Sequence, residues 1–321
     1  MSEGQRKLEE LNPGVDRFKV SRPVYYEEQG NEVLTALRAY AHDIPIVFRG
    51  PTGCGKSTLA EYICYLLGAG FKDLRKKYGP ELRKAGRGDE TALSRLEKKT
   101  EMFRNDEGFP LVTIGGHEDL DADTLKGRPY IVEDKAFWLN GNAKLAAQYG
   151  GIFYFDEPAE ARPDALVVIH SLTDHRRSLP VEGLGEVIRA HESFGFIMTY
   201  NDKYQDPRKR FKPSTSQRFI HVPLSYPQDP AFEIKIAQEI TGIDPAIARG
   251  FVKIAHETRN LAKQRKIREG ASPREVIMAS ELVISGESPF RAAAYCLAYP
   301  LTDDADVQES IFEIIKNQFR E

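Results

Sequence analysis

The sequence has few cysteines, and none of them is spaced as in a metal site or a disulfide framework. Only Cys54, Cys64 and Cys296 occur among 321 residues, without C-x-x-C spacing. A sparse, odd set of cysteines is typical of proteins in a reducing compartment. We therefore expect a cytoplasmic protein whose stability comes from an ordinary hydrophobic core.

Long apolar runs and a strong charge bias are also missing. No stretch approaches the roughly 20 apolar residues of a membrane-spanning helix, so we expect no membrane insertion. The first eleven residues are charged and lack the apolar segment of a secretory signal. The formal net charge is −3, so the overall charge argues neither for nor against a nucleic-acid partner.

The first two thirds of the chain alternate apolar, β-branched runs with helical periods. Short apolar runs bounded by turn residues predict buried parallel strands; they lie at residues 44–48, 110–114, 151–155, 194–199 and 219–223. After about Tyr226 only helical periods remain. This order predicts an α/β domain with a three-layer parallel sheet over residues 1–225, followed by a smaller all-α domain over residues 226–321.

A charged stretch at residues 68–108 interrupts the α/β order. It is poor in β-branched residues and has weak helical patterning through its leucines, Leu74, Leu82, Leu93 and Leu96. We predict one or two exposed helices inserted into the α/β domain. The two signs of charge are interspersed, which favours a solvated face over a nucleic-acid surface.

Two further segments have a local signature. Residues 177–181 and 186–189 flank Gly183 and Gly185, which predicts a β-hairpin. Residues 1–22 are polar and contain Pro13 and Gly14, which predicts a loose N-terminal arm.

A phosphate-binding loop follows the first predicted strand. Residues 50–57 read Gly-Pro-Thr-Gly-Cys-Gly-Lys-Ser and fit G-x-x-x-x-G-K-[ST] without departure. Glycines let backbone N–H groups point at phosphates, and the next helix directs its positive end at the same anions. The predicted nucleotide-binding residues are Gly50, Pro51, Thr52, Gly53, Cys54, Gly55, Lys56, Ser57 and Thr58.

Within this loop, two side chains have individual roles. Lys56 places an ammonium on the β- and γ-phosphates, and the Ser57 hydroxyl is a ligand of Mg²⁺. A chance glycine-rich turn is the alternative, but the motif, the strand before it and the helix after it agree.

An acidic pair ends the strand at residues 151–155. Asp156 is predicted to bind Mg²⁺ directly or through water, and Glu157 to polarise the attacking water. Such a pair also occurs at ordinary strand ends, so its significance depends on the intact phosphate loop. The guanine motif N-K-x-D and an L-S-G-G-Q-like signature are absent from the sequence, so ATP is the predicted nucleotide.

Together these motifs resemble the AAA+ ATPases, and further segments resemble the CbbQ/NirQ/NorQ group of MoxR-type AAA+ proteins. The segments are Glu118-Asp119-Leu120, residues 125–128, Glu160-Ala161-Arg162, residues 172–177, Tyr200-Asn201, residues 214–219 and residues 300–306. The resemblance covers roughly residue 23 to the C-terminus and departs at residues 68–108.

The resemblance implies an AAA+ core with a helical lid that forms a hexameric ring and binds ATP between subunits. It also implies a partner with a von Willebrand factor A domain and a client enzyme complex. The implied roles are activation of inhibited Rubisco or maturation of nitric oxide reductase.

Three further site residues follow from the resemblance. Asn201 corresponds to sensor 1, which orients the water, although a plain turn asparagine is also common. Arg218 corresponds to the arginine finger that reaches a neighbouring subunit's nucleotide, or is a surface arginine. Arg274 corresponds to sensor 2; the first turn of a helix is a poor place for a cation unless a phosphate is its partner.

Two assignments stay open at the level of sequence. Residues 130–141, with Phe137 and Trp138, correspond to an insert that faces the central pore, but aromatic residues in a predicted loop are as often packed. Arg176 and Arg177 form either a second contact to a neighbouring subunit or an ordinary hairpin flank.

Three alternative functions remain. The hairpin resembles inserts of helicase relatives, which suggests a nucleic-acid motor or loader, but no added DNA-binding motif supports it, so a nucleic-acid partner is not expected. A gas-vesicle-type assembly ATPase is a second alternative, and a nucleotide-gated scaffold with little turnover is a third.

Overall fold

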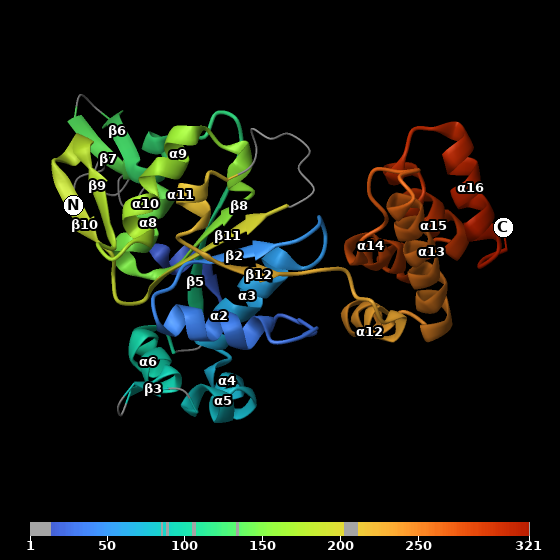
Figure 1. The fold of residues 1–321 in the computed structure, drawn as a ribbon, viewed down its shortest axis with the longest axis horizontal. Helices are drawn as coiled ribbons and strands as arrows, with labels where there is room; N and C mark the ends of the chain where they lie inside the picture. The colour runs from blue at the N-terminus through green and yellow to red at the C-terminus, as the bar shows by residue number, and fades with distance from the viewer. Residues whose placement is uncertain are drawn as a thin grey trace. The chain divides into compact units, whose positions relative to one another are not determined.

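The computed structural model describes residues 14–84, 86–87, 90–104, 107–132, 135–201 and 211–320, and the chain divides into two compact units (Figure 1). The first unit comprises Met1–Val24, Gly30–Gly50 and Lys56–Pro223. The second comprises Leu224–Glu321 together with two short segments, Tyr25–Gln29 and Pro51–Gly55. The second unit therefore includes the middle of the phosphate-binding loop, which a division of the sequence at residue 225 does not anticipate.

In the described part of the first unit, a six-stranded sheet has the order β1-β5-β8-β11-β2-β12. The strands are β1 (Lys19–Val20), β2 (Ile46–Arg49), β5 (Phe109–Gly115), β8 (Gly151–Asp156), β11 (Phe194–Tyr200) and β12 (Ile220–Pro223). All pairings are parallel except that of β1 with β5. The predicted parallel sheet is confirmed, and its strands are apolar runs because neighbouring elements cover them.

The helices that pack on this sheet include α2 (Glu32–Ala41), α3 (Lys56–Leu67) and α8 (Asn142–Tyr149). Successive side chains of a strand point to opposite faces, and on β8 the Tyr154 side chain reaches α3. Two short helices follow β8, α9 (Pro163–Val168) and α10 (His170–Thr173), and they are divided at Ile169.

The N-terminal arm is ordered where the structure describes it. Val15 is buried in the 3₁₀ turn η1 (Val15–Phe18), and β1 pairs with β5 as an antiparallel edge strand. The prediction of a loose arm is wrong from Val15 onward, because a two-residue strand leaves no periodic signal; residues 1–13 lie outside the described residues.

The insertion is helical, as predicted, but it is not merely an exposed decoration. Its described part contains α4 (Phe71–Lys77), α5 (Gly79–Arg83) and α6 (Ala92–Lys99), and α5 and α6 contact α2. The prediction of one or two exposed helices is wrong because each helix has a buried side; the buried leucines are Leu74, Leu82, Leu93 and Leu96.

Within the described residues, the first unit has two longer β-hairpins besides the short antiparallel pair β3 (Gly86–Arg87) and β4 (Glu90–Thr91) (Figure 1). The predicted hairpin is confirmed as β9 (Ser178–Val181) and β10 (Glu186–Arg189). The other, β6 (Gly127–Val132) and β7 (Lys135–Asn140), falls where the sequence indicated a loop. It follows α7 (Ala122–Lys126) directly.

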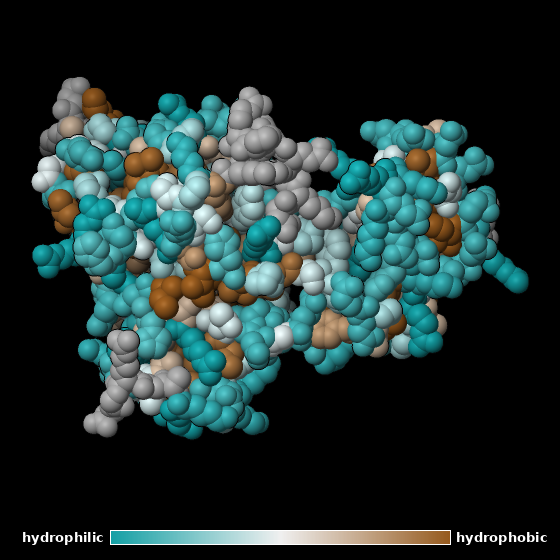
Figure 2. Space-filling view, viewed as in Figure 1, coloured by the Kyte–Doolittle hydropathy of each residue, from teal (hydrophilic) through white to brown (hydrophobic). Residues whose placement is uncertain are grey.

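The second unit is helical over residues 230–316. Its helices are α12 (Pro230–Thr241), α13 (Pro245–Lys263), α14 (Pro273–Ile284), α15 (Pro289–Leu297) and α16 (Ala305–Lys316). Caps explain where they begin: in each case an Asp or Ser side chain at the N-cap accepts a hydrogen bond from a first-turn N–H. The helices enclose a core that includes Phe251, Ile254 and Ile311, and the face seen in Figure 2 is mainly hydrophilic.

A buried ion pair ties this helical unit together. Arg259 donates to both carboxylate oxygens of Glu233, at 2.8 and 2.7 Å, and to the carbonyl of Ala271 at 2.6 Å. Burial alone would raise the pKa of Glu233, but the hydrogen bonds from Arg259 hold this pKa below its usual value. Arg259 therefore fixes the segment that leads into α14.

Candidate functional site

The phosphate-binding loop has the predicted strand–loop–helix arrangement. Gly50 follows β2, and Lys56 begins α3. Gly53 and Gly55 have φ values of 71° and 93°, a region that glycine adopts without strain. The Lys56 side chain is buried, and its Nζ donates to the Gly50 carbonyl at 2.8 Å. The ammonium is therefore held close to the start of the loop that would surround the phosphates.

A hydrogen-bond network joins Ser57 to the acidic end of β8. The Tyr154 hydroxyl lies 2.9 Å from Ser57 Oγ and 3.1 Å from Asp156 Oδ1. Thr199, on the neighbouring strand β11, donates to Asp156 Oδ1 at 2.7 Å. Burial, and then the nearby Asp156 carboxylate, raise the pKa of Tyr154 far above its usual value. The phenol therefore stays protonated and can donate a hydrogen bond.

Glu157 directly follows this network and has an unusual backbone. Its φ of 47° lies in the left-handed region, which costs a non-glycine residue about 1–3 kcal/mol and often marks a functional site. Its N–H donates to Thr199 Oγ1 at 2.8 Å. Gly116, at the end of β5, packs so closely that an added Cβ would collide with the Glu157 carbonyl oxygen. Residues at the ends of β5, β8 and β11 thus fix the position of Glu157, the predicted general base.

The oxygen atoms gathered here fit a magnesium ion. Ser57 Oγ and Asp156 Oδ1 are both hydrogen-bonded to the Tyr154 hydroxyl. Mg²⁺ prefers oxygen ligands and keeps several of its waters. No group of three or more His, Cys, Asp or Glu side chains suited to a metal occurs among the residues that the structure describes. A site with few protein ligands next to a phosphate loop is the type that Mg²⁺–nucleotide uses.

The predicted sensor residue Asn201 comes directly after β11 and is half-buried. Its neighbour Tyr200 accepts a hydrogen bond from the Gly50 N–H at 3.0 Å. The end of β11 is thereby tied to the beginning of the phosphate loop.

Arg218 lies two residues beyond α11 (Pro213–Ser216). Its guanidinium donates to the Ser214 carbonyl, and its buried Nε has no hydrogen-bond partner among the residues that the structure describes. Its positive charge, after burial, contributes to a lowered pKa of His170. Among the described contacts, no hydrogen bond joins Arg218 to the network of Ser57, Tyr154 and Asp156.

Arg274 lies in the second unit, in the first turn of α14. Ser272 caps this helix in a capping box with Glu275. In the same unit, a Cβ added to Gly53 would collide with Ser272 Oγ and would lie 3.3 Å from the Arg274 Cβ. The Tyr226 hydroxyl lies 2.8 Å from the Thr52 carbonyl. The middle of the phosphate loop therefore packs at the N-terminus of α14, where a phosphate would give Arg274 the anionic partner its position requires.

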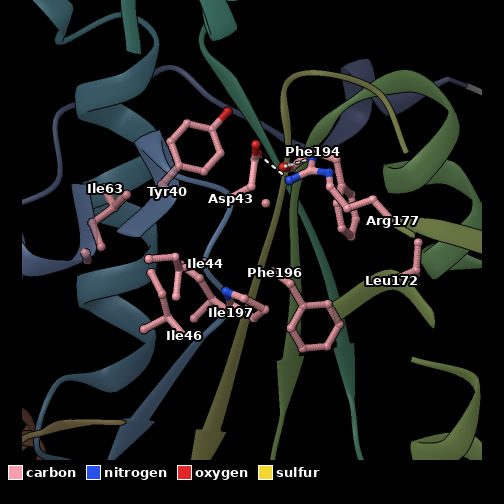
Figure 3. A pocket seen from close by; sticks show the side chains of 13 residues that line it. Tyr40, Asp43, Ile44, Ile46, Ile63, Leu172, Arg177, Phe194, Phe196 and Ile197 are labelled. Atoms are coloured by element: carbon pink, nitrogen blue, oxygen red, sulfur yellow. Dashed lines mark hydrogen bonds and ion pairs between the residues drawn. The ribbon is translucent and has the colours of Figure 1, made fainter. Parts of the chain in front are cut away.

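The two hairpin arginines both have partners within the first unit. Arg176 pairs with Asp174 at 2.5 Å. Arg177, with a φ of 44°, forms an ion pair with Asp43 and donates to the Phe194 carbonyl at 3.2 Å (Figure 3). These contacts agree with the interpretation of Arg177 as a structural flank of the hairpin.

Figure 3 also shows a small cavity beside this ion pair, between Tyr40, Phe194 and Phe196. Its volume is about 10 Å³, which is about the size of one water molecule. The cavity is therefore a local packing gap and not a ligand site.

The structure shows where Trp138, one of the two aromatic residues of β7, lies. Trp138 is half-buried, and its ring packs against Gly183 of the other hairpin, where an added Cβ would lie 2.6 Å from the ring. It is packed, not freely exposed. Tyr130 and Ile131 are exposed large apolar side chains in the described part of this hairpin.

Sequence reasoning missed Tyr154, Thr199 and Gly116. A signal existed for Tyr154, because it lies two residues before Asp156 and strand side chains alternate. Thr199 also lies two residues before Asn201, at the end of a neighbouring parallel strand. No local signal marks Gly116.

No helix in the described ranges has the length and hydrophobicity needed to cross a lipid bilayer.

Comparisons with known proteins agree with these motifs. An AAA domain model (dynein-related subfamily) matches residues 85–219, and a CbbQ/NirQ/NorQ C-terminal model matches residues 233–318. Protein CbbQ of Hydrogenophilus thermoluteolus is 34% identical, over 92% of this chain and 95% of its own. Protein NorQ of Paracoccus denitrificans is 33% identical, over 90% and 92%. The denitrification regulatory protein NirQ of Stutzerimonas stutzeri is 32% identical, over 92% of each chain.

Proposed function

The chain belongs to the CbbQ/NirQ/NorQ family of AAA+ proteins, and we propose that it hydrolyses ATP to remodel a client enzyme complex. The observation that carries this proposal is the network that joins Ser57, Tyr154 and Asp156 directly after the phosphate loop. A plain nucleotide-binding scaffold would not need an acid at the strand end, followed by a second acid held in a strained backbone.

The side chains have distinct roles in the proposed reaction, in which ATP and water give ADP and phosphate. Lys56 and the loop N–H groups bind the phosphates, and Ser57 and Asp156 would hold Mg²⁺. When bound, Mg²⁺ neutralises charge on the β- and γ-phosphate oxygens. Glu157 accepts a proton from the attacking water, and Asn201 orients that water.

We further propose that the chain acts as a hexameric ring with ATP between subunits. Arg218 would act on the neighbouring subunit's nucleotide, and Arg274 on the nucleotide of its own subunit. In support, Arg218 lies in the segment 214–219 that resembles the family's motif, and among the described residues its guanidinium donates to the Ser214 carbonyl and not to the network of Ser57 and Asp156 in its own subunit. Loss of the γ-phosphate contacts would then change the lid and the subunit interface.

The partner and the client are proposed from the family. A protein with a von Willebrand factor A domain would connect the ring to its client, and the client classes are Rubisco and nitric oxide reductase. Identities of 34%, 33% and 32% to CbbQ, NorQ and NirQ do not separate these classes. Co-expression with the von Willebrand factor A protein encoded nearest to this chain's gene tests the partner. Co-purification and a faster ATPase are expected, and neither would appear if the partner is wrong.

Replacing Glu157 by Gln tests the proposed activity. ATP affinity should stay within about twofold, and turnover should fall by about 10²–10⁴, the usual contribution of a general base. Steady-state phosphate release and binding of a fluorescent ATP analogue give the two quantities.

Glu101→Gln is the control for loss of one negative charge, because Glu101 is exposed in the same unit and belongs to none of the family segments; it should behave as wild type. Near-normal turnover in Glu157→Gln would remove Glu157 from the reaction.

A further inference from the structure

Tyr154 lies between the two predicted metal ligands, Ser57 and Asp156, without being part of the sequence motif. Its side chain is 2% exposed, and its hydroxyl lies between Ser57 Oγ at 2.9 Å and Asp156 Oδ1 at 3.1 Å. A buried phenol needs one partner to avoid a desolvation penalty, and this one has two. Both are the side chains expected to hold Mg²⁺.

Counting protons fixes the direction of these hydrogen bonds. An ionised carboxylate only accepts, whereas a hydroxyl donates one proton and accepts others. All three groups are satisfied when Tyr154 donates to Asp156 and Ser57 donates to Tyr154. The Ser57 proton then points at the phenol oxygen, and the Ser57 lone pairs remain available for a metal ion.

Thr199 holds the same carboxylate from the neighbouring strand. Its hydroxyl donates to Asp156 Oδ1 at 2.7 Å and accepts the Glu157 N–H at 2.8 Å. Asp156 Oδ1 therefore receives two hydroxyl donors from one side. Its other oxygen is left for the metal and its waters.

We propose that Tyr154 is a positioning residue that orders Ser57 and Asp156 as a ligand pair for Mg²⁺. It acts through these two side chains and does not contact the metal. The inference rests on the proposed ATPase function, and it adds a determinant of Mg²⁺ affinity that the phosphate-loop motif does not contain. Thr199 assists by fixing Asp156 relative to Glu157.

The test measures binding and does not require turnover. Nucleotide affinity without metal is measured by titrating a fluorescent ATP analogue into the full chain in EDTA. In a separate sample without EDTA, Mg²⁺ is titrated at a fixed nucleotide concentration, and the Mg²⁺ concentration that gives half of the fluorescence change is the Mg²⁺ midpoint. In Tyr154→Phe, nucleotide affinity in EDTA should stay within about twofold, and the Mg²⁺ concentration at half-effect should rise about tenfold, as expected for loss of a hydrogen bond to a charged group.

Tyr40→Phe is the matched control. The Tyr40 ring is also buried, and its hydroxyl donates to the Ser193 carbonyl at 2.8 Å, so the substitution likewise deletes one buried hydrogen bond. It should leave the Mg²⁺ midpoint unchanged. Thr199→Val is a second test that does not depend on the folding of Tyr154→Phe, and it should raise the midpoint in the same direction.

The outcomes separate the two proposals. Asp156→Asn should raise the Mg²⁺ midpoint; if it does while Tyr154→Phe leaves the midpoint unchanged, the role of Tyr154 is wrong. Weaker nucleotide binding of Tyr154→Phe in EDTA would also contradict that role, because the loop itself would then be disturbed. An unchanged midpoint in both variants would overturn the metal site and the positioning role together. A raised midpoint in a protein that does not hydrolyse ATP would support Tyr154 and contradict the proposed function.

Discussion

Glu157 is held in its left-handed conformation by close packing as well as by hydrogen bonds. The Gly116 N–H donates to the Asp156 carbonyl at 2.8 Å, and a Cβ added to Gly116 would lie 2.2 Å from the Glu157 carbonyl oxygen. A side chain at position 116 would have to displace backbone, which is costlier than moving the end of a flexible side chain. The position of the predicted base therefore depends on a glycine in the neighbouring strand.

Gly116→Ala tests this dependence. We expect turnover to fall at least about tenfold and the free energy of unfolding to fall by about 1–3 kcal/mol, because the Cβ pushes the Glu157 backbone away. Phosphate release and urea unfolding measure the two effects. Gly115→Ala is the control, because a Cβ there has nothing within 4 Å. Equal turnover in the two variants would show that the close approach does not position Glu157.

The residues of the site differ in how far the sequence could predict them. Lys56, Ser57, Asp156 and Glu157 belong to contiguous motifs whose spacing reflects their chemistry. Thr199 lies two residues before Asn201, but its place beside Asp156 follows from the pairing of β8 with β11, in which Phe155 lies opposite Met198. Gly116 required knowledge of which strand lies beside β8. Long-range strand order, which no local pattern encodes, explains what was missed.

At the scale of elements, the insertion is a packed part of the first unit. Arg38 of α2 donates to the Glu81 carbonyl of α5 at 3.1 Å. Lys99 of α6 donates to the Tyr40 carbonyl at 2.9 Å and pairs with Asp43 at 2.5 Å. Burial lowers the pKa of Lys99, and Asp43 opposes this change. These contacts connect the insertion to the residues around Arg177.

Leu82→Ala measures how much this packing contributes. Leu82 is fully buried, so its truncation should lower the free energy of unfolding by about 2–5 kcal/mol. Met102→Ala, at a side chain that is 58% exposed in the same insertion, should change it by about 0.5 kcal/mol or less. Urea unfolding followed by circular dichroism provides the comparison. Similar small effects in both variants would restore the view of the insertion as surface decoration.

Element boundaries followed local signals where those were strong. The helical periods after Tyr226 are confirmed, and prolines 230, 245, 273 and 289 each stand at the first position of a helix of the second unit. The buried side of the insertion is hard to predict from the sequence, because interspersed charges obscure the leucines of that side. Its helices also have only 5–8 residues. The β6–β7 hairpin does have a local signal, because the β-prone runs 130–132 and 136–139 flank Glu133 and Asp134. Pro129 obscures this signal, since proline argues against a strand.

At the scale of the whole molecule, the chain combines an AAA+ core unit with a helical unit that matches the CbbQ/NirQ/NorQ C-terminal model. The middle of the phosphate loop is grouped with the helical unit, next to Ser272 and Arg274. In the proposed ATPase, a change in the nucleotide contacts of this segment would therefore act on Ser272 and Arg274 at the start of α14.

The central claim is that ATP is hydrolysed at sites shared between subunits, and the ATPase rate per subunit as a function of protein concentration tests it most directly. Wild type, Arg218→Ala and the exposed control Arg249→Ala are compared. We predict a specific rate that rises with concentration in wild type and in the control, and that falls by about 10³ or more in Arg218→Ala, the usual effect of losing an arginine finger. A rate that is independent of concentration and survives Arg218→Ala would contradict the claim, because each site would then be complete within one chain.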